Sequence, residues 1–159
     1  MKITILTVGK IKEKYFTDAI KEYTKRLSRY CKLEIIEVAD EKTPDNASEH
    51  EEDLIRQKEG ERLQKYIKEG AYVISLAIEG KQYPSEDFSR KIHNLGLHGE
   101  SHLVFVIGGS LGLSGAVLNR ADYRLSFSRM TFPHQMMRVV LLEQIYRSER
   151  IQRNEPYHK

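Results

Sequence analysis

The sequence predicts an α/β domain, with a mostly parallel sheet of about five strands covered by helices on both faces. Two observations carry this prediction. Segments rich in β-branched residues alternate with helical segments along the whole chain, which is typical of parallel sheets. Several strand-like segments, such as KITILTV (2–8) and HLVFVI (102–107), are almost continuously apolar, as strands buried on both faces are. Because 159 residues suit one domain with its own core, we expect a single domain over residues 1–159.

The first half of the chain shows two strand–helix pairs. A helix over residues 13–30 is indicated by apolar residues that recur on one face. A second, strongly charged helix follows a turn at residues 43–46, with Ser48 as its N-cap, although Gly60 weakens it locally. The predicted elements of this half are a strand over 2–8, a helix over 13–30, a strand over 33–39 and a helix from Ser48 to about Lys68.

The second half repeats this alternation and adds a glycine-rich loop. We expect Ser85 to cap one helix and Pro133 to open the last one, because proline fits the first helical turn. The predicted strands cover residues 71–78, 102–107 and 123–127. The predicted helices run from Ser85 to about Leu97, from the glycine loop to about Ala121, and from Pro133 to about Arg150.

The last predicted helix has apolar residues on nearly all of its faces. Eight of the eleven residues from Met136 to Tyr146 are apolar. Such a helix must be buried on more than one side, either as a central core helix or beneath a second subunit. Its place near the end of the chain favours a subunit interface, so we expect a homodimer.

Charge is distributed unevenly along the chain. Residues 10–33 contain eight Lys or Arg and three acidic residues, and residues 120–159 contain eight and four. Residues 40–61 contain three and nine. After folding, the two basic segments could form a positive face that attracts a polyanion, although solvated helix surfaces give the same pattern.

The composition also excludes several classes of protein. Cys31 is the only cysteine, so it can form neither an internal disulfide nor a cysteine-rich metal site. The histidines outside the C-terminal motifs show no metal-ligand spacing, and no metal is expected. The first apolar run is too short for a signal peptide, and no run is long enough to cross a membrane. We therefore expect a soluble, cytoplasmic protein with no membrane partner.

Two motifs indicate a ligand site at one edge of the sheet. Four glycines lie within residues 108–115, directly after a predicted strand, where ligands of parallel sheets bind. Their spacing matches neither the dinucleotide fingerprint nor a P-loop, and a tight strand-to-helix connection is the alternative. The second motif, residues 127–134, leads into the last helix, whose first N–H groups are free to face a ligand.

Together with the C-terminal tail, these motifs resemble one known family. The IGGSxGLS loop (107–114), the TFPH segment (131–134) and the NxPYH tail (154–158) are similar to the bacterial large-subunit rRNA pseudouridine N3-methyltransferase H family of the SPOUT class. The opening KITILTVGK is similar as well, so the resemblance covers essentially the whole chain. It implies a homodimer that uses S-adenosylmethionine to methylate a pseudouridine of 23S rRNA in assembled ribosomes.

The resemblance further implies a knotted fold and a set of binding residues. A deep trefoil knot is expected within a cofactor region over about 71–150, followed by a functional tail over 151–159. The partner subunit's tail is expected to help complete each active site. The S-adenosylmethionine pocket is expected to be lined by Leu76, Gly108, Phe127, Ser128, Arg129, Met130, Thr131 and Phe132.

Methylation of this kind requires a base, because the acceptor nitrogen loses a proton. Tyr157, His158 and His134 are the candidate catalytic residues. A structural contact at the helix start is the alternative for His134, and a disordered tail is the alternative for the other two. The residues expected to contact RNA phosphates are Arg129, Arg138, Arg153 and Lys159.

Two other functions stay open from the sequence. A non-catalytic ribosome-binding protein would use the same basic faces and would need no S-adenosylmethionine. A SPOUT enzyme that acts on transfer RNA would have a similar site, and the sequence shows no separate RNA-binding domain that would distinguish it.

Overall fold

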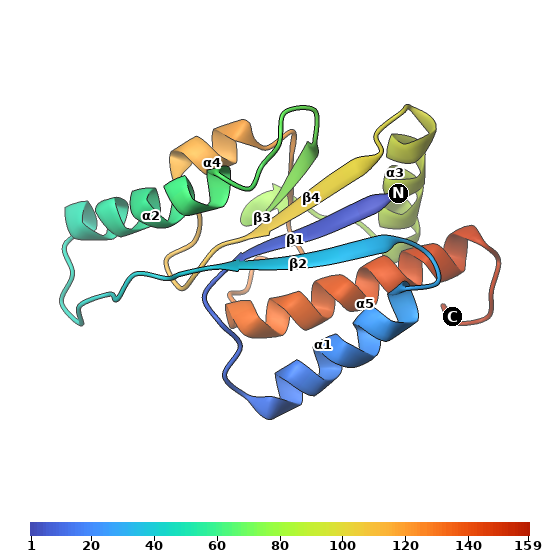
Figure 1. The fold of residues 1–159 in the computed structure, drawn as a ribbon, viewed down its shortest axis with the longest axis horizontal. Coiled ribbons are helices and arrows are strands. Elements are labelled where there is room, and N and C mark those ends of the chain that lie inside the picture. The colour runs from blue at the N-terminus through green and yellow to red at the C-terminus, as the bar shows by residue number, and fades with distance from the viewer.

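The computed structural model describes residues 1–159 and contains one five-stranded sheet with helices on both sides (Figure 1). The strand order is β2-β1-β4-β3-β5, and every pairing is parallel. The α/β class and the number of strands are therefore confirmed. The strands are β1 (Lys2–Val8), β2 (Lys32–Val38), β3 (Tyr72–Lys81), β4 (His102–Ile107) and β5 (Tyr123–Leu125). The helices are α1 (Lys14–Leu27), α2 (Glu49–Gln64), α3 (Ser85–Leu97), α4 (Gly115–Arg120) and α5 (His134–Gln152).

The helices form two layers, one on each face of the sheet, as predicted. Helices α1, α3 and α5 pack together over one face, and α2 and α4 pack together over the other (Figure 1). Strand β4 contributes Phe105 to the first layer and Val104 and Val106 to the second. Because side chains alternate between two buried faces, this central strand is apolar throughout its length.

The helix caps differ in how well the sequence predicts them. Ser48 caps α2 in a reciprocal capping box with Glu51, as expected. The prediction for Ser85 is wrong, because Pro84 occupies the N-cap position of α3. The Ser85 hydroxyl instead donates a hydrogen bond to Oε1 of Gln144 at 2.8 Å, which joins α3 to α5.

The last helix lies in the core of its own chain. Helix α5 packs against α1, α3 and β4, and Leu141 and Ile145 are at most 1% exposed. Burial within its own chain therefore accounts for much of the apolar surface of α5. The position of this helix near the end of the chain did not indicate that burial. Met136 differs from these residues, because it is 39% exposed at the start of the helix.

The ends of β3 and β5 pass very close to one another. The Ser126 N–H donates to the Lys81 carbonyl at 2.9 Å, and a Cβ at Gly80 would lie 2.7 Å from the Arg124 carbonyl oxygen. Only glycine fits this crossing. These contacts do not test the threading of the chain, so the trefoil knot stays a prediction. None of the helices combines the length and the apolar content that crossing a bilayer requires.

Candidate functional site

A cleft of about 730 Å³ opens at the carboxyl ends of the strands. The sheet register sets its floor, because Leu76 of β3 pairs with Leu125 of β5 and the preceding Ser75 pairs with Val106 of β4. Three segments form its walls: the end of β3, the glycine loop after β4, and the chain from β5 into α5. This is the edge at which parallel sheets bind their ligands.

The glycine loop is a tight turn, and its own backbone requires glycine. A Cβ at Gly108 would lie 2.7 Å from the carbonyl carbon of Gly112, and Gly112 has a φ of +82°. The Gly112 N–H closes the turn by donating to the Gly109 carbonyl at 3.0 Å. Gly108 is therefore needed for the shape of the loop itself.

Local hydrogen bonds shape the wall between β5 and α5. The Ser126 hydroxyl donates to the Ser128 carbonyl, and the Met130 N–H donates to the Ser128 hydroxyl, both at 3.0 Å. Arg129 is exposed and does not line the cleft, unlike the other expected cofactor residues. Those that line it are Leu76, Gly108, Phe127, Ser128, Met130, Thr131 and Phe132.

Several other residues line the cleft that the sequence did not indicate. They come from the end of β3, the glycine loop, α4 and the start of α5, and the sequence did not show which side chains of these segments face the cleft. For β3 the available signal was the apolar pair Ala77 and Ile78, which follows Leu76 directly. These residues include Ala77, Ile78, Glu79, Leu113, Leu118 and Met137.

His134 lies in the cleft wall at the first position of α5. Burial, with a smaller effect from the Arg138 charge, lowers the pKa of His134. Its Nδ1 atom is buried and has no hydrogen-bond partner. The ring is therefore neutral near pH 7, and a neutral imidazole has a nitrogen that can accept a proton.

The C-terminal tail folds back along α5 and is not disordered. The Tyr157 hydroxyl donates to Oε1 of Glu143 at 3.0 Å, and burial together with this carboxylate raises the pKa of Tyr157 to about 12. His158 lies 3.0 Å from Arg147 through Nδ1 and 2.6 Å from Glu86 through Nε2. Neither Tyr157 nor His158 lines the cleft of its own chain. The structure thus separates two predicted catalytic residues from the third, His134.

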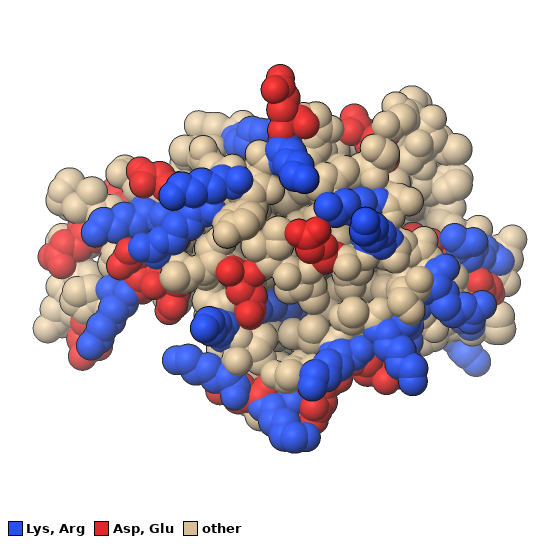
Figure 2. All heavy atoms as spheres, viewed as in Figure 1, with Lys and Arg blue, Asp and Glu red and all other residues tan.

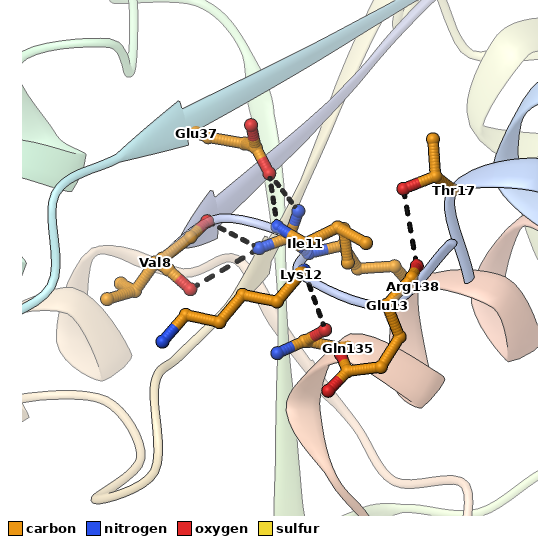
Figure 3. A network of polar contacts seen from close by, with 9 residues as sticks. Val8, Ile11, Lys12, Glu13, Thr17, Glu37, Gln135 and Arg138 are labelled. Atoms are coloured by element: carbon orange, nitrogen blue, oxygen red, sulfur yellow. Dashed lines mark hydrogen bonds and ion pairs between the residues drawn. The ribbon is translucent and has the colours of Figure 1, made fainter. Parts of the chain in front are cut away.

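The expectation that Arg138 contacts RNA is wrong, because Arg138 is only 1% exposed. Its guanidinium donates to the Gly9 carbonyl at 2.6 Å and to Oε2 of Glu37 at 2.5 Å (Figure 3). An arginine within an apolar helix is stable when its charge is paired in this way. The sequence did contain a signal that Arg138 is buried, because this arginine lies within the apolar run from Met136 to Tyr146.

The other three basic candidates remain accessible. Arg153 forms an ion pair with Glu149 at 3.7 Å and lies over the ring of Tyr30, yet about half of its side chain is exposed. Arg129 and Lys159 are exposed. No group of three or more His, Cys, Asp or Glu side chains is arranged to hold a metal ion.

Arg138 belongs to a network that fixes the loop between β1 and α1 beside the cleft (Figure 3). The Ile11 N–H donates to Oε2 of Glu37, and the Lys12 N–H donates to Oε1 of Gln135, both at 3.3 Å. The loop is therefore bonded to β2 and to the first turn of α5. Because that turn also carries His134, the network determines where this wall of the cleft stands.

Comparison with known proteins agrees with this geometry. The family described as "Predicted SPOUT methyltransferase" matches residues 1–158. The chain is 66% identical to the ribosomal RNA large subunit methyltransferase H of Bifidobacterium adolescentis and 60% identical to that of Clostridium kluyveri, over the full length of each protein. A solved structure of a probable methylase family protein from Haemophilus influenzae shares the fold, with a TM-score of 0.57 at 12% identity over 99% of this chain and 70% of that one. The chain therefore belongs to the SPOUT methyltransferases, in the family of ribosomal RNA large subunit methyltransferase H.

Proposed function

We propose that the protein transfers a methyl group from S-adenosylmethionine to N3 of a pseudouridine in the 23S rRNA of assembled ribosomes, in the cytoplasm. The observation that carries the proposal is the cleft at the carboxyl ends of the strands, which combines the glycine loop with seven of the eight expected cofactor residues. The names of the two relatives, which specify large-subunit ribosomal RNA, support the substrate class.

The cleft fits S-adenosylmethionine in size and in chemistry. Its volume of about 730 Å³ lies in the range of small-molecule sites. Apolar side chains such as Leu76, Ile78 and Leu118 suit the adenine ring, whereas the hydroxyls of Ser128 and Thr131 suit polar groups of the ligand. When bound, S-adenosylmethionine supplies an electrophilic methyl group on a positively charged sulfur.

The protein then has to position the acceptor base and remove its proton. Orienting the acceptor in line with the methyl group supplies much of the rate enhancement in reactions of this type. His134 can accept the imide proton at a ring nitrogen, because its lowered pKa keeps it neutral near pH 7. His158 is the alternative acceptor, supplied together with Tyr157 by the tail of the partner subunit, since both lie outside the cleft of their own chain. The raised pKa of Tyr157 keeps its hydroxyl protonated, so Tyr157 would act as a hydrogen-bond donor that orients the acceptor base.

A homodimer is part of this proposal. Four large apolar side chains are exposed around the cleft and the start of α5, and such clusters are typical of interfaces. They are Ile78 at 45%, Met130 at 71%, Phe132 at 41% and Met136 at 39% exposed. Substitutions at Leu141 or Ile145 would not test the interface, because both side chains are buried within one chain.

The dimer has a direct test with a matched control. Met136→Lys should shift the protein from dimer to monomer in sedimentation, because the interface would bury an unpaired charge. Leu97→Lys changes a 70% exposed residue at the end of α3 and should leave the dimer intact. An intact Met136→Lys dimer would place the interface elsewhere.

The function is tested by binding and by methyl transfer. We expect S-adenosylmethionine to bind in calorimetry and the purified protein to methylate ribosomes from a strain that lacks this activity. Mass mapping of the rRNA from that strain should show one pseudouridine without its N3 methyl group. Absence of S-adenosylmethionine binding would favour a non-catalytic ribosome-binding protein, and methylation of transfer RNA alone would identify the other substrate.

A further inference from the structure

The loop between β1 and α1, residues 9–13, forms a fixed rim beside the cleft. Arg138, Glu37 and Gln135 bond to its backbone, as described above. A Cβ at Gly9 would lie 3.7 Å from Cε1 of His134, which is part of the cleft wall. In Figure 1 the loop runs beside the first turn of α5. The side chains of this loop are therefore held next to the site of the proposed reaction.

The loop carries two lysines without acidic partners. Lys10 and Lys12 are exposed, and neither forms an ion pair. Lys14, the next lysine along the chain, is paired with Asp18 at 2.9 Å. The side chain of Lys12 points away from the hydrogen-bonded network, although its backbone is part of that network (Figure 3). Both ammonium groups are thus free to bind an anion.

Charged side chains of both signs lie near these lysines, but none of the carboxylates forms an ion pair with them. Lys and Arg side chains, with Asp and Glu side chains between them, lie along the lower edge of the molecule, over α1 and the loop before it (Figure 2). The carboxylate of Glu37 is already bound by Arg138. Asp40, beside Gly9, and Glu13, at the start of α1, are the carboxylates left near the rim.

We propose that Lys10 and Lys12 bind backbone phosphates of the RNA next to the nucleotide that enters the cleft. This inference rests on the proposed function and names the part of the protein that positions its substrate. Lysine–phosphate contacts fix the register of a nucleic acid without reading its sequence. Since the network holds the loop backbone in place, binding requires little further ordering of that segment.

The test compares two double variants that remove the same charge. Lys10→Ala/Lys12→Ala removes the rim lysines. Lys65→Ala/Lys68→Ala removes two exposed, unpaired lysines at the end of α2, toward the opposite edge of the sheet. Both proteins are assayed with intact ribosomes at several salt concentrations, and their affinity for S-adenosylmethionine is measured separately by calorimetry.

We expect the rim variant to raise KM for ribosomes by roughly tenfold or more, with kcat and S-adenosylmethionine affinity nearly unchanged. The dependence of log KM on log salt should become shallower by about two, one for each lost phosphate contact. The α2 variant should behave as the wild type. Equal KM and equal salt dependence in the two variants would overturn the inference. A wild-type protein that binds neither S-adenosylmethionine nor ribosomes would instead refute the proposed function.

Discussion

Replacing Arg138 by methionine removes the guanidinium that joins α5 to β2 and to the end of β1 beside the cleft. The methionine is unbranched and apolar, and it fills part of the space of the arginine side chain. The Gly9 carbonyl loses a hydrogen bond of 2.6 Å, and Glu37 loses its ion-pair partner. A buried acceptor left without a donor costs about 1–3 kcal/mol. Breaking a fully buried ion pair costs about 3–5 kcal/mol, but the Glu37 side chain is 35% exposed, so water compensates for part of this loss.

Together these effects predict that the free energy of unfolding falls by about 3 kcal/mol. With a denaturant slope of about 2 kcal/mol per molar urea, the unfolding midpoint should decrease by about 1.5 M at equal protein concentration. Affinity for S-adenosylmethionine should fall as well, since the wall that contains His134 loses its anchor. Arg138→Lys, which keeps the charge but not the planar fork, should have an intermediate effect.

Arg90→Met is the matched control, because Arg90 forms only an exposed ion pair with Asp87. Such pairs contribute at most about 1 kcal/mol, so its midpoint should change by less than about 0.5 M. If Arg138→Met unfolds at the same urea concentration as Arg90→Met, the network in Figure 3 does not stabilise the fold and the reasoning fails.

Three further predictions follow from the site and its surroundings. Gly108→Ala should weaken S-adenosylmethionine binding at least tenfold without unfolding the protein, since its Cβ would meet the backbone of Gly112; calorimetry showing unchanged affinity would contradict this. Burial raises the pKa of Glu59, so ionisation of this carboxyl destabilises the fold as pH rises. In urea unfolding, Glu59→Gln should therefore stabilise the protein more at pH 8 than at pH 4, and an equal effect at both pH values would show that ionisation of Glu59 does not affect stability. Removal of residues 156–159 should leave S-adenosylmethionine affinity nearly unchanged, because the tail lies outside the cleft of its own chain, but should strongly reduce single-turnover methyl transfer to ribosomes; wild-type rates would leave His134 as the base.

The sequence by itself determined the order of the elements and the edge of the sheet that bears the cleft. Strand β4 occupies residues 102–107 as predicted, because a continuous apolar run between polar boundaries is compatible with only one stretch of buried backbone. Ser48 was identifiable as a cap since a capping box is a local arrangement of residues close in sequence. The order of the motifs likewise indicated the family that the full-length relatives now show.

Only the tertiary structure decided which neighbours these residues meet. Apolar periodicity reports that α5 is buried, but not that α1 and α3 of the same chain bury Leu141 and Ile145. A basic residue in the sequence looks the same whether it is exposed, as Lys12 is, or enclosed, as Arg138 is. The difference lies in partners such as Gly9 and Glu37, which are about a hundred or more residues away along the chain and are brought together only by the parallel sheet. Contacts between distant segments depend on the packing of the whole fold, and no local pattern of residues encodes them.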